Sequence, residues 1–364
     1  MRTIRFLHRW LGGLIGLLLA VLGLSGTLLL YEDAWLRAAL PHAAETQRND
    51  TASVAAALDR LFGAAEAPTS IILSTATAGV HRVSFGREAG AYADQTGALV
   101  ARWSSQWERW ELWVFDLHHH LFAGDTGETV AGIAALAGLG FVVTGAILWW
   151  PSRRTFRPRV WPRNMGRGAI VAHHRDVGTL LAPLLAMSLL TGAMMTLPPV
   201  RAFLLSPFSS SAEMDAASAP PGVRGGARSR DLDWPAILGG ARDRFPGAEL
   251  RIVSMPRKDG DLIRIRLRQP WEWLPNGRTM VWVDPADGRI VESRDAGAAP
   301  LGSRVFSFVY PVHAAKVGGA IYTAAMTLCG LALTALGSLA VYSFWLAKLG
   351  RLRRPHRRSA AAAP

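Results

Sequence analysis

Four long apolar stretches constrain this chain more than any other feature of its sequence. Each is almost free of charge and long enough to form a helix across the hydrocarbon core of a bilayer, which takes about 20 residues. The stretches are Leu11–Tyr31, Val130–Trp150, Val177–Leu197 and Gly318–Leu346. No soluble core accounts for four such runs, so the sequence predicts a membrane protein with four transmembrane helices.

The distribution of charge predicts which segments lie on which side of the membrane. The chain carries 40 Lys and Arg against 27 Asp and Glu, a formal net charge of +13. Residues 1–10, 151–176 and 347–364 hold 16 of these basic residues and one acid, Asp176. Because basic loops stay in the cytoplasm, both termini and the middle loop are predicted to be cytoplasmic. The charge is then a topology signal that favours contact with membrane lipid, and no nucleic acid is expected as a partner.

The predicted organisation alternates membrane helices with extramembrane segments. Residues 32–129 form a first outer module that ends in a Trp-rich helix, and residues 198–317 form a linker and a second outer module. The other segments are the cytoplasmic N-terminus (1–9), the first helix (10–31), the second helix (130–150), a basic cytoplasmic loop (151–176), the third helix (177–197), the fourth helix (318–346) and a basic cytoplasmic tail (347–364). The single cysteine, Cys329, excludes a disulfide framework and thiolate clusters.

The two halves of the chain share motifs, which predicts an internal duplication. His8 and His174 precede the first and third helices, and each is followed by Arg at the next position and Gly four residues on. His118 and His313 each precede a Gly by six residues ahead of the second and fourth helices. Two halves of equal orientation predict a pseudo-twofold axis along the membrane normal.

Each outer module is predicted to hold one amphipathic helix, several short strands and a hairpin whose turn is bracketed by Asp and Gly. The helices are residues 52–62 and 234–245, and a flexible linker is predicted over 207–230. The predicted strands cover 70–74, 80–85, 249–254 and 262–268, and the predicted hairpins cover 91–100 and 281–291.

These motifs resemble those of the PepSY-associated transmembrane family, which includes ferric-siderophore reductases of bacterial inner membranes. The resemblance rests on both Asp…Gly hairpins, on the two His-Arg-x-x-Gly motifs, on His118-x-x-Leu121-x-x-Gly124 and on the run from Thr144-Gly145 to Trp149-Trp150-Pro151. It implies a membrane α-helical bundle of four transmembrane helices, duplicated 2+2, with two periplasmic α+β PepSY-like modules. It also implies location in the bacterial inner membrane.

The duplication predicts that His8 meets His174 at one membrane face and that His118 meets His313 at the other. Two neutral imidazoles that face each other can be the axial ligands of a haem iron. One or two haem b groups are therefore predicted, with His8, His174, His118 and His313 as iron ligands and His173, His119 and His120 as alternates. The competing interpretation is that each histidine is an ordinary hydrogen-bonding residue of the membrane interface. A copper or zinc site lacks carboxylate or thiolate support.

Other residues allow two interpretations each. Arg9 and Arg175 are possible partners of haem propionates, or simply anchors on the cytoplasmic side. Asp176 could orient an imidazole or pair with Arg175. The alternating Arg264, Arg266 and Arg268 form a solvated strand face or attract an anionic chelate. Four tryptophans at helical spacing suggest an interfacial belt; they are Trp103, Trp107, Trp110 and Trp113. The histidines without a repeat partner are predicted to be solvated; they are His42, His81 and His356.

Together the histidines and the resemblance predict a haem-containing electron-transfer protein. It would take electrons from an unidentified donor and reduce a ferric-siderophore or other Fe(III) chelate on the periplasmic side. The alternative is a non-enzymatic membrane module that binds a peptide, protease or transporter partner.

Overall fold

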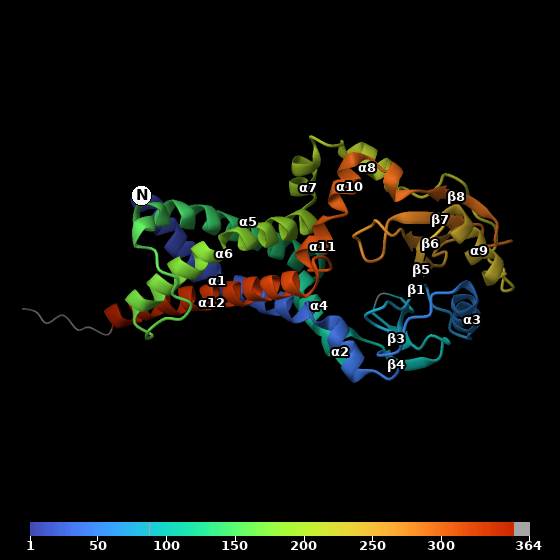
Figure 1. Ribbon diagram of the computed structural model, residues 1–364, viewed down its shortest axis with the longest axis horizontal. Coiled ribbons are helices and arrows are strands. Elements are labelled where there is room, and N and C mark those ends of the chain that lie inside the picture. Colours follow the sequence, from blue (N-terminus) through green and yellow to red (C-terminus); the bar gives the residue numbers. More distant parts are fainter. Residues whose placement is uncertain (87, 353–364) are drawn as a thin grey trace, which may run out of the picture. The chain divides into compact units, whose positions relative to one another are not determined.

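The computed structural model describes residues 1–86 and 88–352 of the chain, so the predicted tail from residue 353 on, with His356, lies outside the described residues. The chain divides into two units. A helical unit combines Met1–Thr27, Leu117–Leu197 and the chain from Ala320 on. A sheet unit combines Leu28–Asp116 and Pro198–Gly319 (Figure 1). Each unit is therefore built from segments that are distant in sequence.

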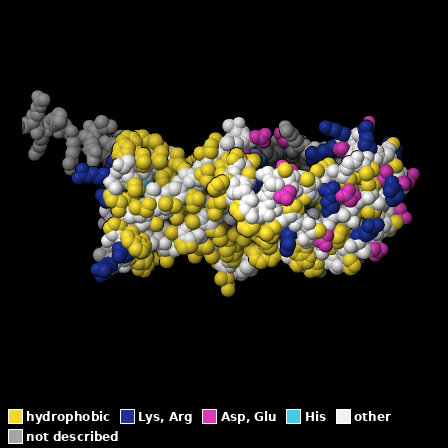
Figure 2. Space-filling model, turned by 90° about the horizontal axis from the view of Figure 1, so that it is seen from above, with side chains coloured by type: hydrophobic (Ala, Val, Ile, Leu, Met, Phe, Trp, Pro, Cys, Tyr) yellow, Lys and Arg dark blue, Asp and Glu magenta, His cyan; other side chains and the backbone are white. Residues whose placement is uncertain are grey.

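In the described part of the chain, four helices are long and apolar enough to cross a membrane, as predicted. They are α1 (Arg2–Leu29), α5 (Gly124–Trp149), α6 (Arg167–Thr196) and α12 (Gly319–Leu352). Both α1 and α6 begin several residues before the predicted apolar stretch, so His8 and His174 lie within helices. Figure 2 shows a largely hydrophobic surface over this unit, with Lys and Arg side chains at the end where the N-terminus lies.

Glycines let α1 and α12 approach closely. A Cβ atom at Gly16 would lie 2.9 Å from the carbonyl oxygen of Gly337, and one at Gly23 would lie 2.7 Å from that of Gly330. Small residues at such crossings bring helix backbones into van der Waals contact within a bilayer. The short helix η2 (Trp150–Thr155) follows α5 at the start of the predicted basic loop.

The described part of the sheet unit forms one eight-stranded antiparallel sheet in the order β4-β3-β2-β1-β5-β6-β7-β8. The two predicted modules are joined because β1 pairs with β5, with Ile71 opposite Val253. The strands are β1 (Ser70–Ile72), β2 (His81–Ser84), β3 (Gly90–Ala93), β4 (Leu99–Trp103), β5 (Glu249–Ser254), β6 (Ile263–Arg268), β7 (Thr279–Val283) and β8 (Ile290–Arg294).

Both predicted Asp…Gly hairpins form. Asp94 accepts hydrogen bonds from the backbone of Thr96 and Ala98, and Gly97 adopts a φ of 81° in the β3–β4 turn. Asp284 and Gly288, whose φ is 75°, occupy the equivalent places between β7 and β8. Positive φ is unfavourable for residues with a Cβ atom, which explains glycine at these two positions.

The core of the sheet unit lies between one face of the sheet and the helices α3 (Thr51–Phe62) and α9 (Trp234–Arg244), which Figure 1 places on the same side of the strands. Leu58, Leu238 and Ile265 are fully buried there. The alternation along β6 puts Ile263, Ile265 and Leu267 in this core and its three arginines on the opposite face. The predicted helices and strands of both halves are therefore confirmed to within a few residues.

Several shorter helices were not predicted. They are α2 (Glu32–Ala39), α7 (Pro198–Leu205), α8 (Ser211–Ser218), α10 (Leu301–Phe306), α11 (Val309–His313), η1 (Gln106–Glu108) and η3 (Ala296–Ala298). The predicted Trp-rich helix ahead of the second membrane helix is present as α4 (Trp110–His120). The predicted flexible linker over 207–230 was wrong in part, because Ser210 and Glu213 form a capping box that begins α8.

The prediction of a single tryptophan stripe on one helix was also wrong. Trp103 ends strand β4 and is buried, and Trp107 lies in η1. Trp110 and Trp113 are exposed on α4, the helix that ends in the three consecutive histidines. The spacing was misleading because a strand, a turn and a helix follow each other within eleven residues.

Candidate functional site

His8 and His174 lie close together in the helical unit. His8 is in the second turn of α1 and His174 is in the second turn of α6. Their ring centres are 6.1 Å apart and the ring planes are nearly perpendicular, at 88°. The Phe141 ring of α5 packs edge-on against His8 at 5.3 Å. The structure thus brings together the two histidines that the sequence repeat had paired.

A hydroxyl group orients the His8 ring. His8 Nδ1 lies 2.8 Å from Thr144 Oγ1 on α5, and the same hydroxyl donates its proton to the Gly140 carbonyl at 2.7 Å. Since a hydroxyl has one proton to donate, His8 Nδ1–H must donate to Thr144. The lone pair of His8 Nε2 is then free to bind a metal.

Glycines leave space beside this histidine pair. A Cβ atom at Gly12, one turn after His8, would meet no described atom within 4 Å. At Gly145 it would meet only the His8 ring, at 3.8 Å, and at Gly178 only Leu336, at 3.9 Å. These open positions contrast with the tight glycine contacts between α1 and α12 further along the bundle.

The residues next to His174 anchor the predicted basic loop. His173 is buried, and its Nδ1 hydrogen-bonds the Arg159 carbonyl at 3.1 Å. Asp176 is fully buried and forms ion pairs with Arg159 at 3.0 Å and Arg175 at 2.7 Å. Asp176 therefore takes the second of its two predicted roles. Arg175 has its Nε engaged by Asp176, and Arg9 is exposed.

His118 packs against a Ser-Gly step of α1. Ser25 Oγ lies 3.1 Å from His118 Nδ1 and donates its proton to the Val21 carbonyl at 2.8 Å. His118 Nδ1–H therefore donates to Ser25, which repeats the arrangement of His8 with Thr144. A Cβ atom at Gly26 would lie 2.8 Å from the His118 ring, so this approach requires glycine.

The neighbouring histidines continue away from this contact. The His119 ring centre lies 5.7 Å from that of His118, and His120 follows at 5.9 Å from His119. His313 is the last residue of α11 and belongs to the sheet unit. The pairing of His118 with His313 stays a prediction. In residues 1–86 and 88–352, no three His, Cys, Asp or Glu side chains converge to hold a metal ion.

A buried polar cluster in the sheet unit was missed from the sequence. His81, predicted to be solvated, is only 1% exposed. Its Nδ1 accepts a hydrogen bond from the Ser74 backbone at 2.8 Å, and Arg251 donates to the Ser74 carbonyl at 2.8 Å. Burial lowers the pKa of His81 from 6.5 to about 4. The prediction failed because it rested on the absence of a repeat partner, which says nothing about burial. His42, in contrast, is exposed and bonds only Glu45, as predicted for a solvated histidine.

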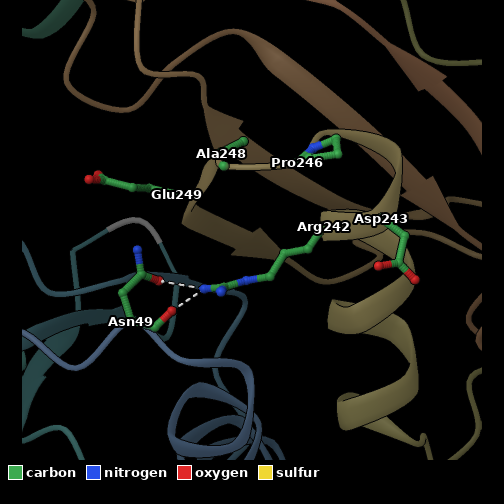
Figure 3. Close-up of a pocket in the computed structure, with 7 residues that line it drawn as sticks. Asn49, Arg242, Asp243, Pro246, Ala248 and Glu249 are labelled. Carbon is green, nitrogen blue, oxygen red and sulfur yellow. Dashed lines mark hydrogen bonds between the residues drawn. The ribbon is translucent and has the colours of Figure 1, made fainter.

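The sheet unit also contains a pocket of about 460 Å³ (Figure 3). Arg242 of α9 reaches across it and donates to the backbone and side-chain oxygens of Asn49, just before α3. Asp243, Pro246, Gly247, Ala248 and Glu249 complete its lining. None of the predicted site residues lies in this pocket, and its charged groups are of both signs.

Comparison with known proteins identifies a family for the chain. No curated protein matches the sequence. The family described as the PepSY-associated TM region matches residues 5–348, which includes all four membrane helices and the sheet unit. This protein therefore belongs to the PepSY-associated TM region family.

Proposed function

We propose that this protein binds haem b between His8 and His174 and passes electrons outward across the bacterial inner membrane to an Fe(III) chelate. The separation of the two imidazoles carries the proposal. Two imidazoles on one iron have ring centres about 6 Å apart, since each metal–nitrogen bond is about 2 Å long. The observed 6.1 Å agrees with this spacing.

The hydrogen bonds and glycines around the pair support the same interpretation. Thr144 favours the tautomer in which His8 Nε2 would be the ligand. Second-shell bonds of this kind are typical of ligating histidines. Gly12, Gly145 and Gly178 leave room for a flat macrocycle against the helices. Arg9 and the terminal nitrogens of Arg175 are the proposed partners of its propionates.

A second haem, bound by His118 and His313 with His119 or His120 as alternates, belongs to the same proposal. The Ser25 contact supports His118, because the hydrogen bond at Nδ1 orients its ring. The mirrored strand order of the sheet supports the proposed 2+2 duplication. Basic side chains at the N-terminal end of the helical unit support cytoplasmic termini and periplasmic placement of the sheet unit.

In this function the protein supplies ligands, orientation and a dry environment rather than bond chemistry. A bound haem supplies one-electron transfer. One electron from an unidentified donor converts Fe(III) in the chelate to Fe(II), which binds hard oxygen ligands more weakly and is released. A ferric siderophore is the proposed substrate class.

Spectroscopy of the purified full chain tests the proposal. We expect a b-type spectrum that changes on reduction and one or two haems per chain. His8→Ala and His174→Ala should each remove one haem or change its spectrum, while the exposed His42→Ala should have no effect. The reduced protein should release Fe(II) from a ferric siderophore to a colorimetric Fe(II) chelator. A folded protein that stays colourless after expression with added haem would refute the proposal and leave the non-enzymatic binding module.

A further inference from the structure

Arginines from three separate segments gather around one aromatic ring in the sheet unit. Arg201 of α7 and Arg278, just before β7, lie over the Phe306 ring of α10, at 5.1 and 5.4 Å from its centre. Arg266 of β6 donates to the carbonyl of Gly277, the residue before Arg278, at 2.7 Å. The fold therefore concentrates positive charge at a point where β6, β7, α7 and α10 meet.

The acid within this group, Glu272, offsets only part of the charge of the three guanidinium groups. Glu272 is buried, and its carboxylate accepts hydrogen bonds from the backbone of Gln269, the backbone of Arg278 and the hydroxyl of Thr279. These donors are all uncharged. Within the described part of the chain, Arg201, Arg266 and Arg278 form no ion pair with a carboxylate. The cluster therefore carries an excess of positive charge.

Two further observations favour a bound anion. The Nε atom of Arg278 is buried and has no hydrogen-bond partner among the described residues. Buried donors without an acceptor are rare and costly. In addition, burial and the charges of Arg278 and Arg264 lower the pKa of Arg266 to about 10, against the attraction of Glu272. An oxyanion would satisfy the free donor and offset the repulsion among the arginines.

The surroundings of the cluster indicate where this anion comes from. Arg201 follows Leu197, the C-cap of the membrane helix α6, by four residues. At about 3.5 Å per residue the chain keeps Arg201 within about 14 Å of the end of that helix. Phe203 of the same short helix is 77% exposed, and the exposed Trp273 and Phe308 rings pack together at 4.8 Å. Exposed aromatic side chains are typical of the lipid headgroup layer, and Phe203 follows the C-cap of α6 by only six residues.

We propose that Arg201, Arg266 and Arg278 bind the phosphate group of an anionic phospholipid, with Phe203, Trp273 and Phe308 in the headgroup layer around it. Guanidinium groups suit this ligand because their planar fork matches two phosphate oxygens. The site would fix the sheet unit to the membrane surface at a second point besides the chain connections. It does not depend on haem or on reductase activity.

Lipid titration of the full chain tests this site. The delipidated protein is titrated with phosphatidylglycerol in detergent, and bound lipid is counted by native mass spectrometry. Arg201→Gln with Arg278→Gln should weaken binding by about tenfold or more, since two charge-assisted hydrogen bonds are lost. Arg289→Gln is the matched control, because Arg289 lies in the exposed β7–β8 turn, and it should bind like the wild type.

Three results would overturn the proposal. Equal weakening in the control variant would indicate unspecific surface charge. Inorganic phosphate that binds as tightly as the lipid, with the same loss in the double variant, would assign the site to a soluble oxyanion. Unchanged binding in Arg278→Lys, which keeps the charge but removes the buried Nε donor, would remove Arg278 from the site. This milder variant also keeps the test decisive if the double variant fails to fold.

Discussion

A methyl group at Gly26 would collide with the His118 ring. In Gly26→Ala the new Cβ atom would lie 2.8 Å from His118 Cε1, closer than real Cβ contacts, and 3.3 Å from Nδ1, which is a tight contact. The ring would have to move and give up its hydrogen bond to Ser25. Overpacking costs about 1–3 kcal/mol and a lost hydrogen bond about 1 kcal/mol. Because alanine is also the better helix former by about 1 kcal/mol, we expect Gly26→Ala to lower the free energy of unfolding by about 1–3 kcal/mol, and the coupling to His118 to be about 2–4 kcal/mol.

A double-mutant cycle separates this collision from any other effect of the methyl group. In a His118→Ala background the ring is absent, and alanine is the better helix former by about 1 kcal/mol. The same substitution should then be neutral or stabilising by up to about 1 kcal/mol, which gives a coupling energy of about 2–4 kcal/mol. The assay is the midpoint of thermal unfolding in detergent, followed by tryptophan fluorescence.

Gly140→Ala on α5 is the matched control for this cycle, because a Cβ atom there meets no described atom within 4 Å. It should not lower the midpoint in either background. If Gly26→Ala destabilises the protein equally with and without His118, the packing of His118 against α1 is refuted. The proposed orientation of its Nε2 would be refuted with it.

Two further predictions concern buried ionisable groups. The pKa of His81 is about 4 when folded and about 6.5 when unfolded, so the unfolded chain binds more protons between these values. The free energy of unfolding should thus fall as the pH drops from about 6.5 to 4, by up to about 3 kcal/mol, and His81→Phe should lose this component. Denaturant titrations at both pH values measure it, and equal pH slopes in the two proteins would contradict it. Asp176→Asn removes the carboxylate shared by Arg159 and Arg175, which are partly exposed. It should lower the free energy of unfolding by about 1–2 kcal/mol. A thermal midpoint no lower than that of the exposed control Asp215→Asn would rule this out.

The features that the sequence predicts correctly are those set by local rules. The length of the apolar stretches defines the four membrane helices, because bilayer thickness determines it. Alternation along residues 263–268 separates Ile265 from Arg266, and the Asp…Gly pairs define both turns. The pairing of β1 with β5 is different. It joins segments almost 180 residues apart, and no local sequence pattern in either strand indicates which strand it pairs with.

In the candidate site, too, local motifs could be recognised from the sequence, but contacts between distant segments could not. The shared His-Arg-x-x-Gly motif predicts that His8 meets His174, and their rings lie 6.1 Å apart in the structure. The contribution of Thr144 could not be predicted, since the motif containing it lies on a different helix. The contact of Ser25 with His118 could not be predicted either, because it depends on the packing of α4 against α1.

The continuous ladder through β1 and β5 limits how this protein can be divided. If either half of the sheet were produced alone, one of these strands would become an open border with unpaired amide and carbonyl groups. Such borders recruit strands from other molecules and lead to aggregation. Each half of the sheet therefore covers a strand of the other half that would otherwise be an exposed edge. Truncated or transplanted versions of the protein should keep both halves together.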